Sequence, residues 1–287
     1  MERPSRQSVT AGAPAAVYAD RMQPIPFILE VLRRCGAVAR RHFGRTAERI
    51  KPHDRHQVVT EADLEIARLV ADAIDAAFPD HSRLDEELGG VDRGSPYTWV
   101  VDPIDGTSNF AAGVPLYGTM IGLLHDGRPA ACGVGLPAFD ALYWAERGAG
   151  AFCGERRLAM ADGDLSAALV AFSMDGDPDD PGRTRAECAA LAEIAMAARG
   201  VRASNSVYDA ALLAEGRYGG WVVWSSHIWD SVAPHLLIEE AGGVFTRADG
   251  GAVAYHAPLA RVADNFPICA APPRMHGRLL AALCPSR

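Results

Sequence analysis

The sequence has no run of about 18 apolar residues, which is the length that a membrane-spanning helix needs. Residues 1–24 also lack the apolar central region of a secretory signal, and they are rich in Ala, Ser and Pro with scattered Arg. We therefore expect residues 1–24 to form a flexible tail. We also expect a cytoplasmic protein that has no membrane partner.

Paired cysteines and positive charge are scarce. The six cysteines form no Cys-x-x-Cys pair and no Cys/His zinc spacing, so we expect reduced thiols rather than disulfides or a zinc site. Lys and Arg number 28 against 36 Asp and Glu, which gives a net charge of −8. Nucleic acid is therefore not an expected partner. An anionic substrate would be repelled as well, unless a bound metal ion reversed the charge locally.

Two loop sequences resemble ligand-binding motifs without meeting the requirements of those motifs. Residues 148–154 are rich in glycine but lack the lysine of a phosphate loop and the spacing of a Rossmann motif. Residues 175–182 resemble a calcium loop but have Pro178 at the fourth position and Asp180 where an EF-hand requires glycine. We interpret the first as a structural turn and the second as a flexible loop without a ligand.

Apolar periodicity divides the chain into two parts. Residues 25–160 predict helices over 25–43 and 60–78, a mobile loop at 51–55, and strands at 97–101, 117–124, 130–136 and 141–145. Residues 161–287 predict strands at 168–172, 201–203, 221–224, 244–246 and 268–270, which alternate with helices over 184–198, 207–215 and 230–240 and a terminal helix. We therefore predict an α+β / α/β fold, with an N-terminal α+β subdomain at 25–160 and a C-terminal α/β subdomain at 161–287.

Two carboxylates follow the predicted strand Tyr97–Val101. Asp102 and Asp105 are three residues apart, and Gly106 and Thr107 come directly after them. The Asp-Pro step is expected to end the pairing of the strand after Val101. Carboxylates at the end of a buried strand are costly unless a cation compensates them, and a hard divalent ion would do so. The alternative is an ordinary turn, since Asp, Pro and Gly are common in turns.

Acidic residues also mark three other segments. Thr60-x-x-Asp63 has the form of a helix capping box, and Asp63 also lies at the start of the buried face of that helix. The acidic run 85–87 is, by itself, typical of a solvated loop. Asp230 lies at a predicted helix start, where capping would explain it, with Pro234 in or just past the first turn. Each segment alone therefore has a structural explanation as well as a functional one.

Taken together and in this order, the segments resemble the inositol monophosphatase family of metal-dependent phosphatases. The resemblance extends from residue 25 to the C-terminus and rests on these motifs: Thr60-x-x-Asp63, Glu86-Glu87, Asp102-Pro-Ile-Asp105-Gly-Thr107-x-Asn-Phe, and Trp229-Asp230 with Glu240-Ala-Gly-Gly243. It implies a layered αβαβα sandwich of the sugar-phosphatase type, a homodimer, and hydrolysis of a small-metabolite phosphate monoester by metal-activated water. In it, the N-terminal subdomain carries most metal ligands and the C-terminal subdomain closes the site.

The resemblance also implies roles for individual residues. A first Mg²⁺ would be held by Glu86, Asp102 and the carbonyl of Ile104, and a second by Asp102, Asp105 and Asp230. A third, weaker ion would involve Asp63 and Glu86, and Mn²⁺ could substitute for Mg²⁺. The catalytic residues would be Asp63, Glu86 and Thr107, with Thr107 relaying a proton of the water. The implied substrate-binding residues are Asp105, Gly106, Thr107, Ser108, Ser204, Asn205, Val223 and Asp230.

Val223 departs from the family pattern, because inositol-phosphate enzymes have a glutamate there that binds sugar hydroxyls. An apolar side chain cannot accept those hydrogen bonds. Histidinol phosphate, fructose bisphosphate and a 3′-phosphonucleotide therefore stay open as substrates, and so does a catalytically silent relative that binds a phosphometabolite. Asp85 replaces the glycine of the family's Gly-Glu-Glu and adds a charge. His227 and His235 are expected to be structural or rim residues, since Mg²⁺ prefers oxygen ligands.

Overall fold

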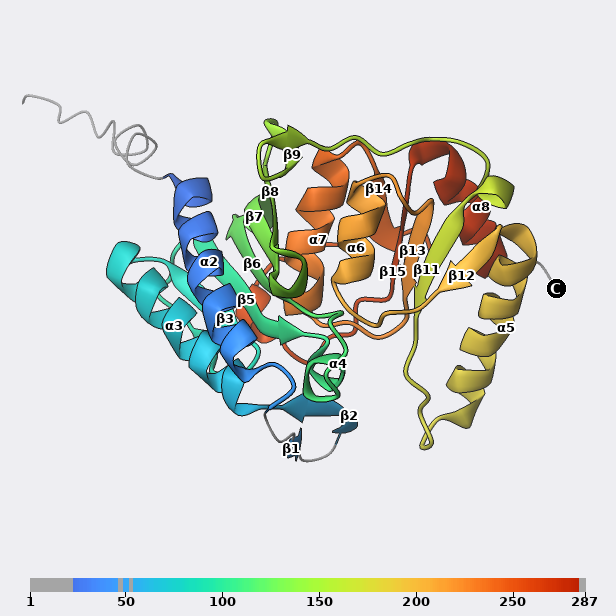
Figure 1. Ribbon diagram of the computed structural model, residues 1–287. Helices are drawn as coiled ribbons and strands as arrows, with labels where there is room; N and C mark the ends of the chain where they lie inside the picture. Colours follow the sequence, from blue (N-terminus) through green and yellow to red (C-terminus); the bar gives the residue numbers. More distant parts are fainter. Residues whose placement is uncertain (1–22, 46–48, 52–53, 284–287) are drawn as a thin grey trace, which may run out of the picture.

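The computed structural model describes residues 23–45, 49–51 and 54–283, and this part of the chain has seven α-helices arranged around two large mixed sheets. Figure 1 shows five layers: a helix pair, the first sheet, a central helix pair, the second sheet and an outer helix pair. This arrangement confirms the predicted layered αβαβα fold. None of the described helices is both long enough and apolar enough to cross a bilayer.

The first layer consists of α2 (Pro24–His42) and α3 (Glu61–Ala77). Both are amphipathic, and their apolar faces pack on the first sheet through buried residues such as Ile28, Leu32 and Ile66. Helix α2 begins at Pro24, where proline is tolerated because that N–H has no helical partner. The expected tail, residues 1–24, therefore overlaps the helix by one residue, Pro24. Residues 1–22 lie outside the described residues.

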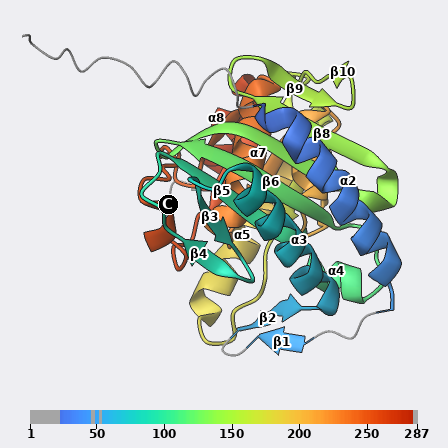
Figure 2. The same ribbon diagram turned by 90° about the vertical axis from the view of Figure 1, so that its left-hand side faces the viewer.

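The first sheet has eight strands in the order β10-β9-β8-β7-β6-β5-β3-β4. Only β3 and β5 pair in parallel, and the others pair antiparallel. Figure 2 shows α2 and α3 lying across one face of this sheet. Its strands are β3 (Ser82–Asp85), β4 (Gly89–Val91), β5 (Tyr97–Asp105), β6 (Gly118–His125), β7 (Arg128–Leu136), β8 (Ala141–Glu146), β9 (Gly150–Cys153) and β10 (Arg156–Arg157).

Strand β5 is longer than the sequence predicts. The pairing with β6 was expected to stop at Val101, but it continues to Asp102 and resumes at Asp105 after an irregularity in register. Pro103 lies inside this irregularity, where its missing N–H removes no ladder hydrogen bond. The prediction of an abrupt end at the Asp-Pro step was therefore wrong, because a bulge accommodates the proline and turns both carboxylates toward the same region.

The segment before α3 forms a hairpin of β1 (Arg49–Lys51) and β2 (Asp54–Val59). A mobile loop was predicted at 51–55. Residues 51, 54 and 55 belong to paired strands instead, and residues 52–53 lie outside the described residues. A polar sequence does not prevent strand pairing here, because the backbone supplies the hydrogen bonds.

The second sheet has the order β12-β11-β13-β15-β14, with parallel pairs on one side of β13 and antiparallel pairs on the other. It lies between the central helices and the outer helices, as Figure 1 shows. Its strands are β11 (Leu169–Ser173), β12 (Gly200–Arg202), β13 (Gly220–Val223), β14 (Val244–Arg247) and β15 (Ile268–Ala271). The remaining helices are α4 (Thr107–Ala111), α5 (Pro181–Ala197), α6 (Tyr208–Ala214), α7 (Ile228–Glu240) and α8 (Pro273–Leu283), with short 3₁₀ turns at Pro137–Phe139, Leu165–Ala167 and Pro258–Ala260.

The central helix α7 connects the two sheets. It packs on β6 and β7 of the first sheet and on β14 of the second, and its residues Leu236 and Leu237 are fully buried. Pro234 was expected in or just past the first turn, but it is the seventh residue of α7 and lies inside the helix. The chain passes from the first sheet to the second between residues 157 and 169, close to the predicted boundary at 160, and the division into subdomains stays a prediction.

Close packing of α2 on the first sheet leads to a prediction about Gly133. A Cβ at this position in β7 would collide with Ile28 Cγ2 and would lie 2.7 Å from Leu32 Cδ1. We expect Gly133→Ala to lower the free energy of unfolding by about 1–3 kcal/mol, because the helix must move away from the sheet. Urea denaturation measures this change.

Gly277→Ala is the matched control. Gly277 lies in α8, and a Cβ there would meet no atom within 4 Å. This substitution should stabilise the protein by about 0.5–1 kcal/mol through helix propensity. Equal effects of the two substitutions would contradict the packing described.

Candidate active site

A cleft of about 610 Å³ lies where the ends of the two sheets approach each other. Its walls come from the end of β5, from α4, from the loops that follow β11, β12 and β13, and from the start of α7. The chain thus contributes to the cleft from segments that are more than 100 residues apart. The lining includes ten of the twelve predicted site residues: Glu86, Asp102, Ile104, Asp105, Gly106, Thr107, Ser108, Asn205, Val223 and Asp230.

Three carboxylates meet at the floor of this cleft. Asp102, Asp105 and Asp230 each have a carboxylate oxygen that lies within 4.8 Å of a carboxylate oxygen of the other two residues. Asp102 and Asp105 come from β5, and Asp230 is the third residue of α7. The Asp230 carboxylate is oriented by the backbone N–H of His227, which donates to it. Asp230 was expected at the cap position, but the cap residue is His227.

Burial and like charge both act on these carboxylates. Burial raises the pKa of Asp102 well above its usual value, and the negative charges of Glu86 and Asp105 raise it further. Burial also raises the pKa of Asp105, and the negative charge of Asp230 raises it further. The Val207 N–H donates to Asp105 and opposes this shift only in part. Without a cation, burial and like charge therefore favour the protonated forms of Asp102 and Asp105.

The cluster has the chemistry of a site for hard divalent cations. Asp102 is 1% exposed, and its Oδ1 has no hydrogen-bond partner among the described residues. A buried carboxylate oxygen without a partner is costly unless it binds a cation. All the candidate ligands are oxygens, which suits Mg²⁺ or Mn²⁺ rather than a softer metal. The residues present therefore fit the ions that the sequence predicts.

Thr107 and Asp63 form a second polar group beside the cluster. The Thr107 hydroxyl lies 2.8 Å from the Ile104 carbonyl oxygen and 3.4 Å from Asp63 Oδ1. Asp63 Oδ2 accepts hydrogen bonds from the backbone and the hydroxyl of Thr60, so the predicted capping interaction exists. Burial raises the pKa of Asp63 to about 6. Asp63 thus caps α3 with one oxygen and faces Thr107 with the other.

Gly106 allows the chain to turn sharply between β5 and α4. Its φ of 79° lies in the left-handed region, and a Cβ there would be 2.8 Å from the Leu116 carbonyl oxygen. Asn109 fixes the same turn, because its side-chain amide donates to the carbonyls of Leu116 and Ser204. These bonds tie α4 to the loop before α6 and hold both walls of the cleft in place.

The other predicted residues are placed as follows. Glu86 follows β3 directly, and its backbone N–H donates to Val101 of β5. Asp63 and Ser204 do not line the cleft. Ser204 is 8% exposed, and its hydroxyl lies 3.3 Å from the Ser206 hydroxyl. Asp85 is buried, with its carboxylate accepting from the Glu87 and Leu88 N–H groups, so the run 85–87 is not a fully solvated loop.

The two histidines differ. His235 is buried in α7, where it bonds to the Tyr255 hydroxyl at 3.0 Å, in agreement with a structural role. His227 lines the cleft beside Asp230 and stacks on Trp229.

Some cleft residues were missed by the sequence analysis. Asp175, Asp177, Asp179 and Arg183 line the cleft, although residues 175–182 were interpreted as a loop without a role. The sequence carried one usable signal, because Asp180 followed by Pro181 is typical of a helix start. Asp180 does cap α5 by accepting from the Arg183 N–H. Nothing in the sequence showed that this helix start faces the carboxylates.

The chain is similar to known proteins over most of its length. A family model described as the inositol monophosphatase family matches residues 21–286. The chain is 36% identical over 249 residues to a probable inositol 1-monophosphatase ImpA of Mycobacterium tuberculosis, which covers 84% of the chain and 86% of that protein. It is 34% identical over 216 residues to a histidinol-phosphatase of Chlorobaculum parvum. This match covers 75% of the chain and 82% of that protein. The solved structure of extragenic suppressor protein suhB from Bartonella henselae superposes on this chain with a TM-score of 0.80 and 26% sequence identity. The match covers 92% of this chain and 99% of the suhB chain.

The raised pKa values predict how the stability of the metal-free protein depends on pH. Burial raises the pKa of Asp63, Asp85 and Asp209 to about 6, and it also raises the pKa of Asp102 and of Asp105 well above the usual value. The folded state therefore binds more protons than the unfolded state above about pH 4, and stability falls as the pH rises through about 6. We expect the melting temperature in EDTA to fall between about pH 5 and pH 7.

Saturating Mg²⁺ should reverse this fall, because cations replace the protons. The variant Asp102→Asn is the comparison, and in EDTA it should lose part of the pH dependence. A melting temperature in EDTA that rises with pH over this range would contradict the electrostatic description of the cluster.

Proposed function

Because the chain belongs to the inositol monophosphatase family, we propose that it hydrolyses a small-metabolite phosphate monoester with Mg²⁺ ions bound at Asp102, Asp105 and Asp230. Members of this family are metal-dependent phosphoric monoester hydrolases. The observation that carries the proposal is the convergence of three cleft carboxylates, one of which has a buried oxygen without a hydrogen-bond partner.

The ligand assignment follows the resemblance to the family, and the closeness of the Asp102, Asp105 and Asp230 carboxylates supports it. Glu86, Asp102 and the Ile104 carbonyl would hold one ion, and Asp102, Asp105 and Asp230 a second; a third, weaker ion would involve Asp63 and Glu86. Mn²⁺ would serve as a substitute, because it accepts the same ligands. When bound, two such ions lower the pKa of a coordinated water and stabilise the leaving oxygen.

Thr107 moves the proton of the attacking water in this proposal. Its Oγ1 is positioned by the Ile104 carbonyl and by Asp63, so it can accept a proton from water while it passes its own to Asp63 Oδ1. Asp63 is only 1% exposed, and burial makes its carboxylate a better proton acceptor than an exposed aspartate. Glu86, which also lines the cleft, would help to orient the same water.

The phosphate group would be received at the turn between β5 and α4. Gly106, Thr107 and Ser108 line the cleft at that turn, and the backbone N–H groups of Gly106 and Thr107 and the hydroxyl of Ser108 would donate to the phosphate oxygens. Asp105 and Asp230 would contact the phosphate through the bound ions, and Asn205 and Val223 would border the alcohol half of the substrate. Ser204 would act indirectly, through its carbonyl bond to Asn109.

The identity of the alcohol is a separate proposal. The relatives described above include a probable inositol monophosphatase and a histidinol-phosphatase, and both act on small phosphate monoesters by name. Phosphate release from myo-inositol 1-phosphate, histidinol phosphate, fructose 1,6-bisphosphate and a 3′-phosphonucleotide, measured in parallel with Mg²⁺, identifies the substrate. Absence of release from every member of this panel would overturn the proposed function and favour a silent phosphometabolite-binding protein.

A cytoplasmic location and a homodimer also belong to this proposal. Both are expected from the resemblance to the family. Phe139, which is 46% exposed and stacks on Tyr208, is a candidate residue for a subunit contact. Size-exclusion chromatography with light scattering measures the number of chains, and a monomer at micromolar concentration would contradict the homodimer.

Asp102→Asn tests the role of the cluster. Loss of one shared carboxylate should lower kcat/KM by at least about a thousandfold, because both proposed ions lose a ligand. The fold should survive, and in EDTA the variant should melt at a higher temperature than the wild type, since a buried charge is removed. Asp140→Asn is the control, because Asp140 is exposed and has a left-handed φ of 48° that Asn tolerates. Activity of Asp102→Asn near that of the control would refute the assignment.

Thr107 is tested by a matched pair of substitutions. Thr107→Val removes the hydroxyl at nearly constant volume and should lower kcat by about 10²–10⁴-fold. Thr107→Ser keeps the hydroxyl and should retain most of the activity. If both variants lose the same activity, the proton transfer does not pass through this oxygen.

A further inference from the structure

Arg183 places a cation in the cleft, in the wall formed by the first turn of α5. It is the third residue of α5, and its backbone N–H is capped by Asp180 at 2.9 Å. Arg183 lines the same cleft as Asp102 and Asp230. Arg183 thus lines the same cleft as Asn205 and Val223, which would border the alcohol half of the substrate.

Glu187 holds the guanidinium of Arg183. Arg183 Nε donates to Glu187 Oε1 at 2.7 Å, one helical turn further along α5. The Glu187 side chain is only 2% exposed, and its second oxygen has no hydrogen-bond partner among the described residues. An exposed pair at this spacing contributes little, whereas a buried carboxylate is costly.

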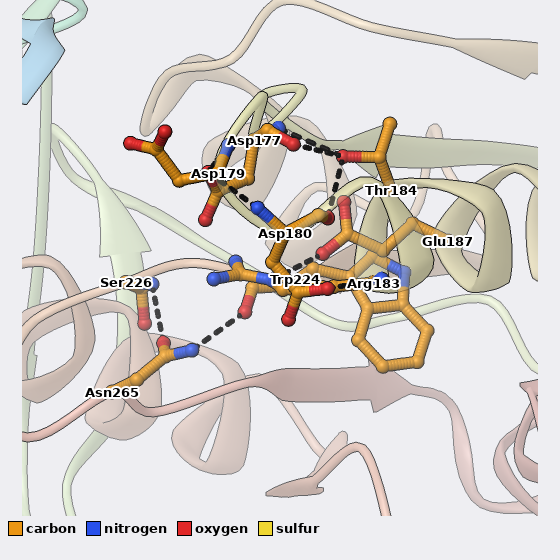
Figure 3. A network of polar contacts seen from close by, with 9 residues as sticks. All are labelled: Asp177, Asp179, Asp180, Arg183, Thr184, Glu187, Trp224, Ser226 and Asn265. Carbon is orange, nitrogen blue, oxygen red and sulfur yellow. Dashed lines mark hydrogen bonds and ion pairs between the residues drawn. The ribbon is translucent and has the colours of Figure 1, made fainter.

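The two terminal nitrogens of Arg183 remain available. Neither Nη group donates a hydrogen bond to another residue in the part of the chain that the structure describes. Figure 3 shows the guanidinium extending away from α5, toward the side on which Ser226 and Asn265 lie. Ser226 also lines the cleft. The fixed Nε and the free Nη groups make Arg183 a preorganised donor for a group on the substrate.

The surrounding charges limit what that group can be. Asp175, Asp177 and Asp179 line the cleft on the loop that precedes α5, and Glu187 neutralises the charge of Arg183. A second phosphate or a carboxylate on the substrate would meet like charges on this loop, such as those of Asp175 and Asp179, while Arg183 is already compensated by Glu187. A hydroxyl group both accepts and donates, so it can bond to Arg183 and to a neighbouring carboxylate. Val223, in the same cleft, offers no such bond.

We propose that Arg183, positioned by Glu187, is a specificity-determining residue that donates hydrogen bonds to a hydroxyl group on the alcohol half of the substrate. The proposal rests on the proposed phosphatase function and adds to it the residue that recognises a hydroxyl group on the alcohol half of the substrate. Arg183 contacts the substrate, and Glu187 acts only through Arg183.

Arg183→Met is the primary test, with two substrates that differ in hydroxyl groups. For myo-inositol 1-phosphate, KM should rise about tenfold with kcat within twofold, which is the loss of a bond made equally in ground and transition states. The preference in kcat/KM for this substrate over p-nitrophenyl phosphate, which has no hydroxyl on its alcohol half, should fall about tenfold. Arg185→Met is the control, because Arg185 is exposed on the same helix and does not line the cleft.

Glu187 is tested by rescue. Glu187→Ala should reproduce the rise in KM without a change in kcat, and Glu187→Gln, which keeps an acceptor for Nε, should recover part of it. A structural role alone would instead lower the melting temperature and kcat on both substrates equally. The double variant Arg183→Met/Glu187→Met replaces the pair with apolar side chains, so it tests the proposal even if a single variant leaves the buried charge unpaired and unfolds.

The outcomes separate this proposal from the proposed function. Phosphate release by the wild type with an unchanged substrate preference in Arg183→Met would overturn the role of Arg183 and leave the phosphatase function standing. A larger loss on fructose 1,6-bisphosphate than on the monophosphate would show that Arg183 binds a second anionic group instead. No release from any substrate by the wild type would overturn the proposed function itself.

Discussion

The structure depends on the electrostatic cost of placing Asp102, Asp105 and Asp230 next to one another. Asp102 and Asp105 lie on β5 and Asp230 lies in the first turn of α7, so the backbone of these two elements keeps the three side chains close together. A cluster of this kind has two low-energy states, one with added protons and one with divalent cations. At neutral pH, the second state offers a positive surface to a phosphate ester in a protein whose net charge is −8.

The layered fold explains how this cost is tolerated. Asp102 and Asp105 lie at the end of a strand that is paired on both sides, and Asp230 lies in a helix packed between the two sheets. The bonds of Asn109 and Val207 join the turn after β5 to the segment before α6. The site is therefore assembled where both halves of the chain meet, and the surrounding core supplies the stability that the charges remove.

The sequence predicted the elements well where pattern and local chemistry agree, as for α2, for α3 with its Thr60–Asp63 cap, and for the cluster of Asp102, Asp105 and Asp230. It failed where tertiary contacts decide. Strand β5 continues past Pro103 because β6 accommodates a bulge, and the loop with Arg183 reaches the cleft only through the packing of α5 on the second sheet. Periodicity carries no information about such distant contacts. The roles of individual site residues stay predictions.

The most direct test of the central claim is the uptake of a paramagnetic ion. Metal-free protein is titrated with Mn²⁺ at neutral pH, and the free ion is followed by electron paramagnetic resonance. The account predicts saturable binding of at least two ions per chain, with release of protons and competition by Mg²⁺. No saturable uptake by the folded protein would contradict it.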